Sequence, residues 1–225
     1  MFFLIDSNLK IIFGWSAKCG CSHIKKIFWY LSTGDINHKI HIKTEYNELP
    51  IDIENYTTII ICRNPYNRII SGFLDKYKTN GEFREMWKNN TIKFRDFVSE
   101  IVKENWSKIQ RHHFIPQTSE KFNEDKIMKS KIIKFYDITK IDYNYIENLY
   151  NKKIPDEVIY HKQGHERGIK EFDYNDYVYD LDMSTYYDYN VDIKYFYDDE
   201  LKEKVHEFYK NDFIFFAKNG IKYEL

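Results

Sequence analysis

The run "TTIIICR", Thr57–Arg63, constrains the fold more than any other stretch of the chain. It is apolar and rich in β-branched residues, and it lacks the alternation of polar and apolar residues found in a strand with one solvent-exposed face. Such a run is typical of a strand that is buried on both faces, as in a parallel sheet covered by helices. The residues that follow it, with Pro65 in the first turn, predict a helix. The centre of the fold is therefore predicted to be a strand–helix unit.

The rest of the chain alternates in the same way. Two more apolar strands are predicted, and we expect the second to be buried: Lys10–Trp15 and Lys131–Ile138. Further helices are predicted over 20–32, 91–105 (with Thr91 as N-cap), 141–153 and 198–216. This order predicts an α/β fold of three layers, with a mostly parallel central sheet flanked by helices. A chain of 225 residues that is 43% hydrophobic can bury one sizeable core, so we predict a single domain over 1–225.

Composition narrows the classes of function. The formal net charge of -1 argues against whole-surface binding to nucleic acid or to an anionic membrane, although it allows a local basic pocket. The apolar start is interrupted by Asp6 and Lys10 and is too short for a signal peptide or a membrane span. The odd number of cysteines (Cys19, Cys21 and Cys62) fits a reducing compartment. We therefore expect a soluble, cytoplasmic protein.

The stretch "GWSAKCGCSHIKK" joins the first predicted strand to its helix. A helix N-terminus offers unpaired N–H groups and partial positive charge, which suit an anion. Gly20 lets the backbone approach a ligand, Lys18 can add an ammonium and Ser22 a hydroxyl donor. The lysine precedes the glycine, so this is not the phosphate loop of nucleoside triphosphatases. An ordinary strand-to-helix turn remains an alternative reading.

A metal site is a second alternative at this stretch. Cys19, Cys21 and His23 could ligate zinc, but the cluster lacks a matching second pair of ligands. The neighbouring Lys25 and Lys26 would also oppose a cation. We therefore expect no metal here.

A second group of polar residues follows the central strand. In "CRNPYNRIISGFLDKY", Arg63 stands at the strand end and Ser71 two helical turns later. A guanidinium and a hydroxyl so placed can converge on one phosphate. Alone, these residues could simply make surface salt bridges. Because ligands of such sheets bind beyond the carboxyl ends of the strands, two such groups suggest a ligand with two separated anionic ends.

Together these stretches resemble the sulfotransferases that use 3′-phosphoadenosine-5′-phosphosulfate (PAPS), particularly the carbohydrate sulfotransferase branch. "SAKCGCS" resembles the 5′-phosphosulfate loop of that family, and "RNPYNRIISGFLDKY" resembles its 3′-phosphate motif. "HHFIPQ" is similar to the His-Trp-x-Pro-Gln element of the branch, with Phe114 in place of the Trp. "KFYDI" and "DELKEKVHEFYKNDFIFFA" follow in family order, so the resemblance runs from about Ile11 to Ala217. It implies a fold related to the P-loop nucleotide kinases.

The resemblance also implies roles for single residues. The 5′-phosphosulfate would be held by Lys18, Cys19, Gly20, Cys21 and Ser22, and the 3′-phosphate by Arg63 and Ser71. Lys18 would neutralise the leaving oxygen, and His113 would be the base, with His112 as the next choice and Glu45 in reserve. Histidine's ordinary pKa of about 6.5 suits that task. Arg167 lies in a polar loop that could close over the cofactor.

The predicted function is therefore PAPS-dependent transfer of a sulfuryl group to an acceptor hydroxyl, with a glycan as acceptor and PAP as product. Three alternatives stay open: a catalytically silent module that binds PAP or another nucleotide, a sulfotransferase acting on protein tyrosine or a small alcohol, and a kinase. The kinase is disfavoured because the sequence has neither the phosphate-loop order of glycine and lysine nor an obvious magnesium carboxylate after a strand.

Overall fold

The computed structural model describes residues 1–36, 48–78, 81–87, 92–119, 122–159, 170–171 and 177–225. They belong to two compact units that interleave along the chain. The first unit is built from Met1–Arg63, Gln117–His161 and Phe215–Ile221. The second is built from Asn64–Pro116, Lys162–Ile214 and Lys222–Leu225.

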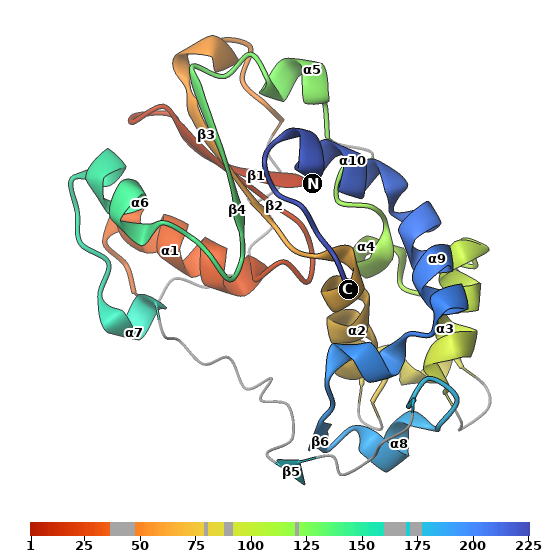
Figure 1. Cartoon of the computed structure of the whole chain (residues 1–225). Coiled ribbons are helices and arrows are strands. Elements are labelled where there is room, and N and C mark those ends of the chain that lie inside the picture. The colour runs from red at the N-terminus through yellow and green to blue at the C-terminus, as the bar shows by residue number, and fades with distance from the viewer. Residues whose placement is uncertain (37–47, 79–80, 88–91, 120–121, 160–169, 172–176) are drawn as a thin grey trace. The chain divides into compact units, whose positions relative to one another are not determined.

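The first unit contains a four-stranded sheet in the order β1-β2-β3-β4 (Figure 1). Its strands are Phe2–Asp6 (β1), Ile11–Trp15 (β2), Thr57–Cys62 (β3) and Ile132–Asp137 (β4). Strand β1 pairs antiparallel with β2, while β2 with β3 and β3 with β4 pair in parallel. The predicted α/β class, with a mostly parallel sheet flanked by helices, is confirmed.

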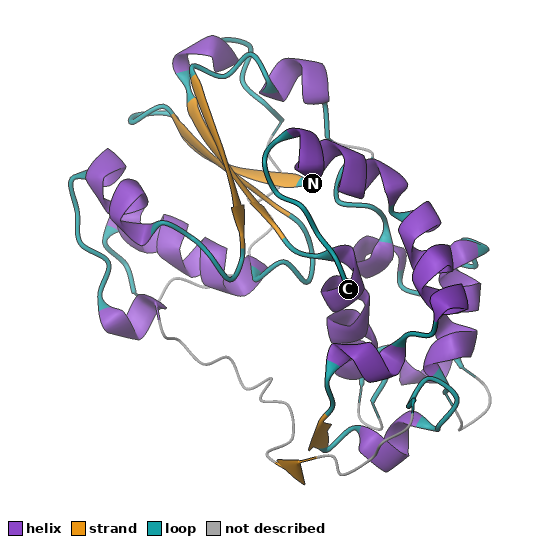
Figure 2. Ribbon diagram, viewed as in Figure 1, coloured by secondary structure: helices purple, strands orange, loops and turns teal. Residues whose placement is uncertain are grey.

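Alternating side chains of this sheet pack into two separate clusters. Phe13 and Ile61 lie in one cluster, with apolar side chains of three helices. These helices are Cys21–Thr33 (α1), Tyr143–Tyr150 (α6) and Asp156–Ile159 (α7), seen beside the strands in Figure 2. Ile12 and Ile60 lie in the other cluster, with residues of the short helices Ile53–Asn55 (η2) and Glu124–Ile127 (α5). All six residues of β3 are buried, as its apolar run predicts.

Two strands differ from the expectation. Strand β1 was not predicted, because its short apolar run acquires a structure only by pairing with β2 through a tight turn. Lys10 closes that turn with a φ of 56°. Strand β4 was predicted to be buried, but Ile132 is 40% exposed and the strand is only partly covered. Its place at the edge of the sheet leaves one side without a neighbouring strand among the described residues.

The second unit is mostly helical and has an aromatic core. Phe94, Phe97 and Phe114 are fully buried there, and Phe73 of α2 and its C-cap residue Tyr77 pack against them. Its elements are Pro65–Lys76 (α2), Arg84–Met86 (η3), Phe94–Val102 (α3), Arg111–Phe114 (α4), Lys170–Glu171 (β5), Met183–Tyr186 (α8), Tyr189–Asn190 (β6), Ile193–Phe196 (η4) and Asp199–Phe208 (α9).

Two helix predictions in this part of the chain need correction. Helix α3 takes Lys93 as its N-cap and begins at Phe94, whereas the predicted cap, Thr91, lies outside the described residues. The helix predicted over 198–216 is two helices, because α9 ends before Tyr209 and α10 (Lys210–Lys218) follows. Apolar spacing continues across this break, so periodicity alone predicts one helix.

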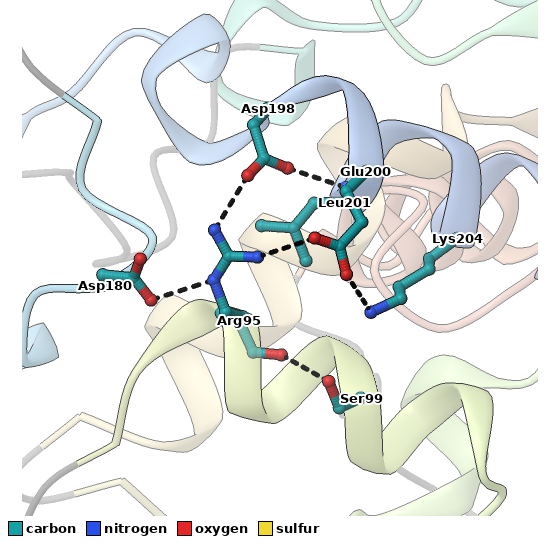
Figure 3. Close-up of polar contacts among 7 residues, drawn as sticks. All are labelled: Arg95, Ser99, Asp180, Asp198, Glu200, Leu201 and Lys204. Atoms are coloured by element: carbon teal, nitrogen blue, oxygen red, sulfur yellow. Dashed lines mark hydrogen bonds and ion pairs between the residues drawn. The ribbon is translucent and has the colours of Figure 1, made fainter.

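A network of ion pairs centred on Arg95 ties α3 to the start of α9 (Figure 3). The Arg95 guanidinium donates to Asp180 at 2.9 Å, to Asp198 at 2.8 Å and to Glu200 at 3.4 Å. Asp198 also caps α9 by accepting a hydrogen bond from the Leu201 N–H. Burial alone would raise the pKa of Asp198, but the Leu201 N–H and Arg95 outweigh it and the pKa is lowered.

Within the residues that the structure describes, no helix has both the length and the apolar character that crossing a bilayer requires.

Candidate anion-binding site

The loop between β2 and α1 is held in an unusual backbone conformation. The Cys19 N–H donates to the Ser16 carbonyl at 3.1 Å, which closes a turn. Lys18 in this turn has a φ of 65°, and Gly20 follows with a φ of 67°. The left-handed conformation costs a non-glycine residue about 1–2 kcal/mol. Strain of this kind tends to occur at ligand-binding sites, and consecutive turn N–H groups form concavities that bind anions.

No side chain caps the first backbone N–H groups of helix α1. Gly20 is the N-cap, no side chain caps the helix, and the first turn contains no acidic residue. The Ile24 N–H makes the first helical hydrogen bond, to the Gly20 carbonyl at 3.0 Å. The helix start therefore keeps backbone donors and partial positive charge for an anion.

Gly20 is also required for space. A Cβ at this position would lie 2.4 Å from Cδ1 of Ile138, which follows β4. The Ile138 N–H is itself hydrogen-bonded to the Cys62 carbonyl at 2.9 Å, at the end of β3. The loop is thus packed closely against the carboxyl ends of the parallel strands, where sheets of this class bind ligands.

Arg63 joins the end of β3 to this loop. Its guanidinium nitrogen Nη1 donates to the Lys18 carbonyl at 2.9 Å. The structure therefore brings together Lys18 and Arg63, the two cationic residues that the sequence predicts at neighbouring strand ends. One predicted anion contact directly supports the backbone of the other.

Gln117 is a site residue to which the sequence analysis gave no role. Its side chain is fully buried, and its Oε1 accepts from the Cys19 thiol at 2.9 Å and from the Arg63 N–H at 3.1 Å. Its Nε2 donates to the Arg63 carbonyl at 2.9 Å. Gln117 thus links the loop after β2 to the end of β3. The only signal in the sequence was its place at the end of the "HHFIPQ" element.

Lys25 is a further cation of α1 that the sequence analysis did not select. It is only 4% exposed, and its Nζ lies 4.1 Å from the centroid of the Trp15 ring, at the end of β2. This cation–π geometry places the Lys25 amine beside the start of the loop. Its spacing of four residues from Cys21, on the apolar face of the helix, could have indicated this burial.

Two of the three side chains considered for zinc, Cys19 and His23, make hydrogen-bond contacts with other side chains. Among these candidates, the Cys19 thiol bonds to Gln117 and His23 Nε2 lies 2.9 Å from the Tyr143 hydroxyl, while Cys21 is partly buried. The third cysteine, Cys62, donates its thiol to the Tyr136 carbonyl at 3.3 Å. In the described part of the chain, no group of three or more His, Cys, Asp and Glu residues could hold a metal ion.

The second unit contains the other predicted residues. Ser71 is partly buried on α2, and His112 and His113 lie on α4 with ring centroids 5.2 Å apart. Phe114 is fully buried, and its ring lies 2.4 Å from the point where a Cβ on Gly72 would stand. Phe114 is therefore a core residue.

The tautomer of His113 follows from its contacts with Gln110. Oε1 of Gln110 accepts from the His113 backbone N–H at 3.0 Å, which fixes the amide oxygen toward this histidine. The same oxygen lies 2.6 Å from His113 Nδ1. An amide oxygen only accepts hydrogen bonds, so Nδ1 carries the proton and Nε2 of the neutral ring carries the lone pair. This is the form in which a histidine acts as a base through Nε2.

The predicted site residues thus fall into two groups. Lys18–Ser22 and Arg63 lie in the first unit, while Ser71, His112 and His113 lie in the second. Arg167 and the reserve candidate Glu45 lie outside the described residues.

Comparison with known proteins gives one match. A family model described as "Sulfotransferase family" matches residues 2–219. No curated protein and no solved structure matches the chain.

Proposed function

Because this chain belongs to the sulfotransferase family, we propose that it transfers a sulfuryl group from PAPS to an acceptor hydroxyl on a carbohydrate. The observation that carries the proposal is the uncapped start of α1, next to Lys18 held at a φ of 65°. The family match spans residues of both compact units, which supports one sulfotransferase domain over 1–225.

The residues of the first unit fit a donor with two anionic ends. The start of α1 supplies N–H donors for a 5′-phosphosulfate, with Lys18, Cys19, Gly20, Cys21 and Ser22 as the proposed contacts. Arg63 would bind the 3′-phosphate, with Ser71 of α2 as a second contact. A guanidinium suits a phosphate because its donors form a planar fork. PAPS itself supplies the activated sulfuryl group.

Lys18 is proposed to stabilise the charge that develops on the leaving oxygen during transfer. Group transfers of this kind depend mainly on positioning and on fixed positive charge, by analogy with phosphoryl transfer. Removing one such preorganised donor typically lowers the rate by about 10²–10³. The strained backbone of Lys18 supports this role, because strain is retained where a side chain must be held in one place.

His113 is proposed to take the proton from the acceptor hydroxyl through Nε2. The support is the Gln110 oxygen, which holds the proton on Nδ1. A positioned base of this type contributes about 10²–10⁴ to the rate. His112 is the second candidate, because it lies beside His113 on the same short helix.

A thermal shift assay with PAP, AMP and ATP with magnesium tests the donor site. PAP at a hundredfold excess over its dissociation constant should stabilise the protein by about 2.7 kcal/mol, because it binds only the folded state. AMP should stabilise it less at the same concentration. Stabilisation by ATP with magnesium and none by PAP would overturn the proposal in favour of a kinase.

Transfer of labelled sulfate from PAPS to a panel of glycans, tyrosine peptides and small alcohols tests the reaction. Glycans should be labelled, Lys18→Ala should abolish labelling in a folded protein, and Lys26→Ala should not. His113→Gln should reduce labelling more than His112→Gln. Binding of PAP with no transfer to any acceptor would instead identify a silent nucleotide-binding module.

A further inference from the structure

Gln117 links the two predicted anion contacts of the first unit. Its amide pairs with both backbone groups of Arg63: the N–H donates to Oε1 at 3.1 Å, and the carbonyl accepts from Nε2 at 2.9 Å. This double pairing fixes which end of the amide is oxygen, because a backbone N–H needs an acceptor and a carbonyl needs a donor. The oxygen also accepts from the Cys19 thiol at 2.9 Å.

The arrangement sets how far apart the two contacts stand. Cys19 belongs to the loop that contains Lys18, whereas Arg63 is the first residue after β3. The side chain of Gln117 is fully buried, so its hydrogen bonds are made away from water and an unmade one is costly. A fourth hydrogen bond joins the two contacts directly, because Arg63 Nη1 donates to the Lys18 carbonyl at 2.9 Å.

We infer that Gln117 is a positioning residue that fixes Arg63 relative to the Lys18–Cys19 loop, and so sets selectivity for nucleotides that carry both a 5′ and a 3′ phosphate. This inference rests on the proposed function, because it takes Arg63 as the 3′-phosphate contact. Gln117 itself touches no ligand in this scheme. Its effect passes through Arg63.

The first test compares the affinities for PAP and AMP, which differ by the 3′-phosphate. In Gln117→Ala the ratio of the two affinities should fall at least threefold, because Arg63 is no longer held while the start of α1 is unchanged. A smaller change in that ratio overturns the inference. In an Arg63→Ala background, Gln117→Ala should change the ratio less than threefold, since residues that act through one another are not additive. A threefold or larger change of the ratio in the Arg63→Ala background also overturns the inference.

Gln117→Glu provides a pH readout that a purely structural role would not give. The ionised carboxylate cannot donate to the Arg63 carbonyl, whereas the protonated acid can both accept and donate as the amide does. Normalised to the wild type at each pH, its PAP-to-AMP ratio should rise as pH falls from 8 to 5.5. The normalised ratio of Gln117→Ala should stay flat. A flat ratio for Gln117→Glu counts against the inference, and this variant carries the test if Gln117→Ala fails to fold.

A measurement without ligand separates this inference from the proposed function. Exchange of the Arg63 amide hydrogen should be at least tenfold faster in Gln117→Ala than in the wild type, because its acceptor is removed. If the wild type binds neither PAP nor AMP, the proposed function fails, and only this measurement tests whether Gln117 holds Arg63 in place. If the wild type binds PAP but the Arg63 amide exchanges at the same rate in Gln117→Ala as in the wild type, the role of Gln117 is wrong and the proposed function stands.

Discussion

Two helices that follow strands of the same sheet begin in opposite ways. After β2, helix α1 has Gly20 as its N-cap, in the left-handed conformation, and no side chain caps its N–H groups. After β3, helix α2 is capped by Asn64, whose side chain accepts from the Tyr66 N–H at 3.0 Å. Pro65 in the first turn of α2 has no N–H to satisfy.

The difference separates a helix start that is available to a ligand from one that is satisfied internally. Capping by Asn or Asp recurs in this chain, since Asp142 caps α6 and Asp198 caps α9. The start of α1, like that of α3, has no side-chain cap, but it also has no acidic residue in its first turn and is preceded by the strained backbone of Lys18. At the β3 junction the proposed anion contact is instead a side chain, Arg63. The two junctions would therefore bind one ligand by different chemistry: backbone N–H groups at one and a guanidinium at the other.

The largest effect on ligand affinity is expected from Gly20→Ala. The new Cβ would meet Ile138 Cδ1 at 2.4 Å in a backbone conformation that already disfavours a side chain, so the loop must move. We expect affinity for PAP, measured by calorimetry, to fall at least about 100-fold, the scale of losing preorganised donors.

Gly34→Ala is the matched control at the other end of α1. Gly34 has a φ of 82°, and the atom nearest to an added Cβ is Lys152 Nζ at 3.6 Å. It should cost about 1–2 kcal/mol of stability, with no change in PAP affinity. The double variant Gly20→Ala/Ile138→Ala should recover part of the binding. Equal losses of affinity at Gly20 and Gly34 would contradict a ligand role for the start of α1.

Lys18→Gly should separate function from stability. It removes the ammonium together with the strain of a side chain at a φ of 65°. Turnover should fall by about 10²–10³. The free energy of unfolding in urea should stay the same or rise by up to about 1 kcal/mol, because relieved strain offsets the added freedom of glycine in the unfolded chain.

Lys10→Gly is the control for that variant. Lys10 also has a positive φ, of 56°, but it lies in the turn before β2, where its ammonium pairs with Asp52 at 3.1 Å. Its replacement should leave turnover unchanged. Turnover of Lys18→Gly within fivefold of the wild type would remove Lys18 from the proposed mechanism.

Much of the fold could be predicted from sequence because its signals are local. The apolar run of β3 and Pro65 at the start of α2 each indicate their own element. The partial exposure of β4 could not be predicted, because it depends on the place of the strand at the edge of the sheet. That place follows from the order in which the strands pair, and the sequence of β4 alone does not contain it. The end of α9 at Tyr209 has no glycine or proline to mark it.

The candidate site divides in the same way. Lys18, Gly20 and Arg63 stand directly after predicted strands, so position and residue type identified them. Gln117 is 54 positions from Arg63 and contacts it only in the folded chain. No rule based on sequence spacing predicts a contact between residues so far apart in the chain. The resemblance of "HHFIPQ" to a family element indicated the residue but not what it contacts.

Asn64→Ala tests the internally satisfied start of α2. Loss of a side-chain N-cap costs about 1 kcal/mol, so the urea midpoint should decrease. PAP affinity should change less than twofold, since the N–H groups of α2 are not proposed to bind the ligand. Asn64→Asp, which keeps an acceptor oxygen, should retain most of the stability. A tenfold loss of PAP affinity in Asn64→Ala would mean that both helix starts serve the ligand.

The smallest effect is expected at Asp198, whose carboxylate caps α9 and pairs with Arg95. Its pKa in the folded protein is lowered, so its contribution to stability is present above the unfolded value of about 3.9 and is lost as pH falls below it. Asp198→Asn keeps the capping oxygen but removes the charge. At pH 7 it should cost less than about 1 kcal/mol, and its stability measured by circular dichroism should fall less than that of the wild type between pH 5 and 2.5. The first turn of α1 has no acidic residue that could titrate in this way. If the stability of Asp198→Asn falls as steeply with decreasing pH as that of the wild type, other carboxylates determine the stability at low pH. The capped helix starts would then differ from α1 in hydrogen bonding alone.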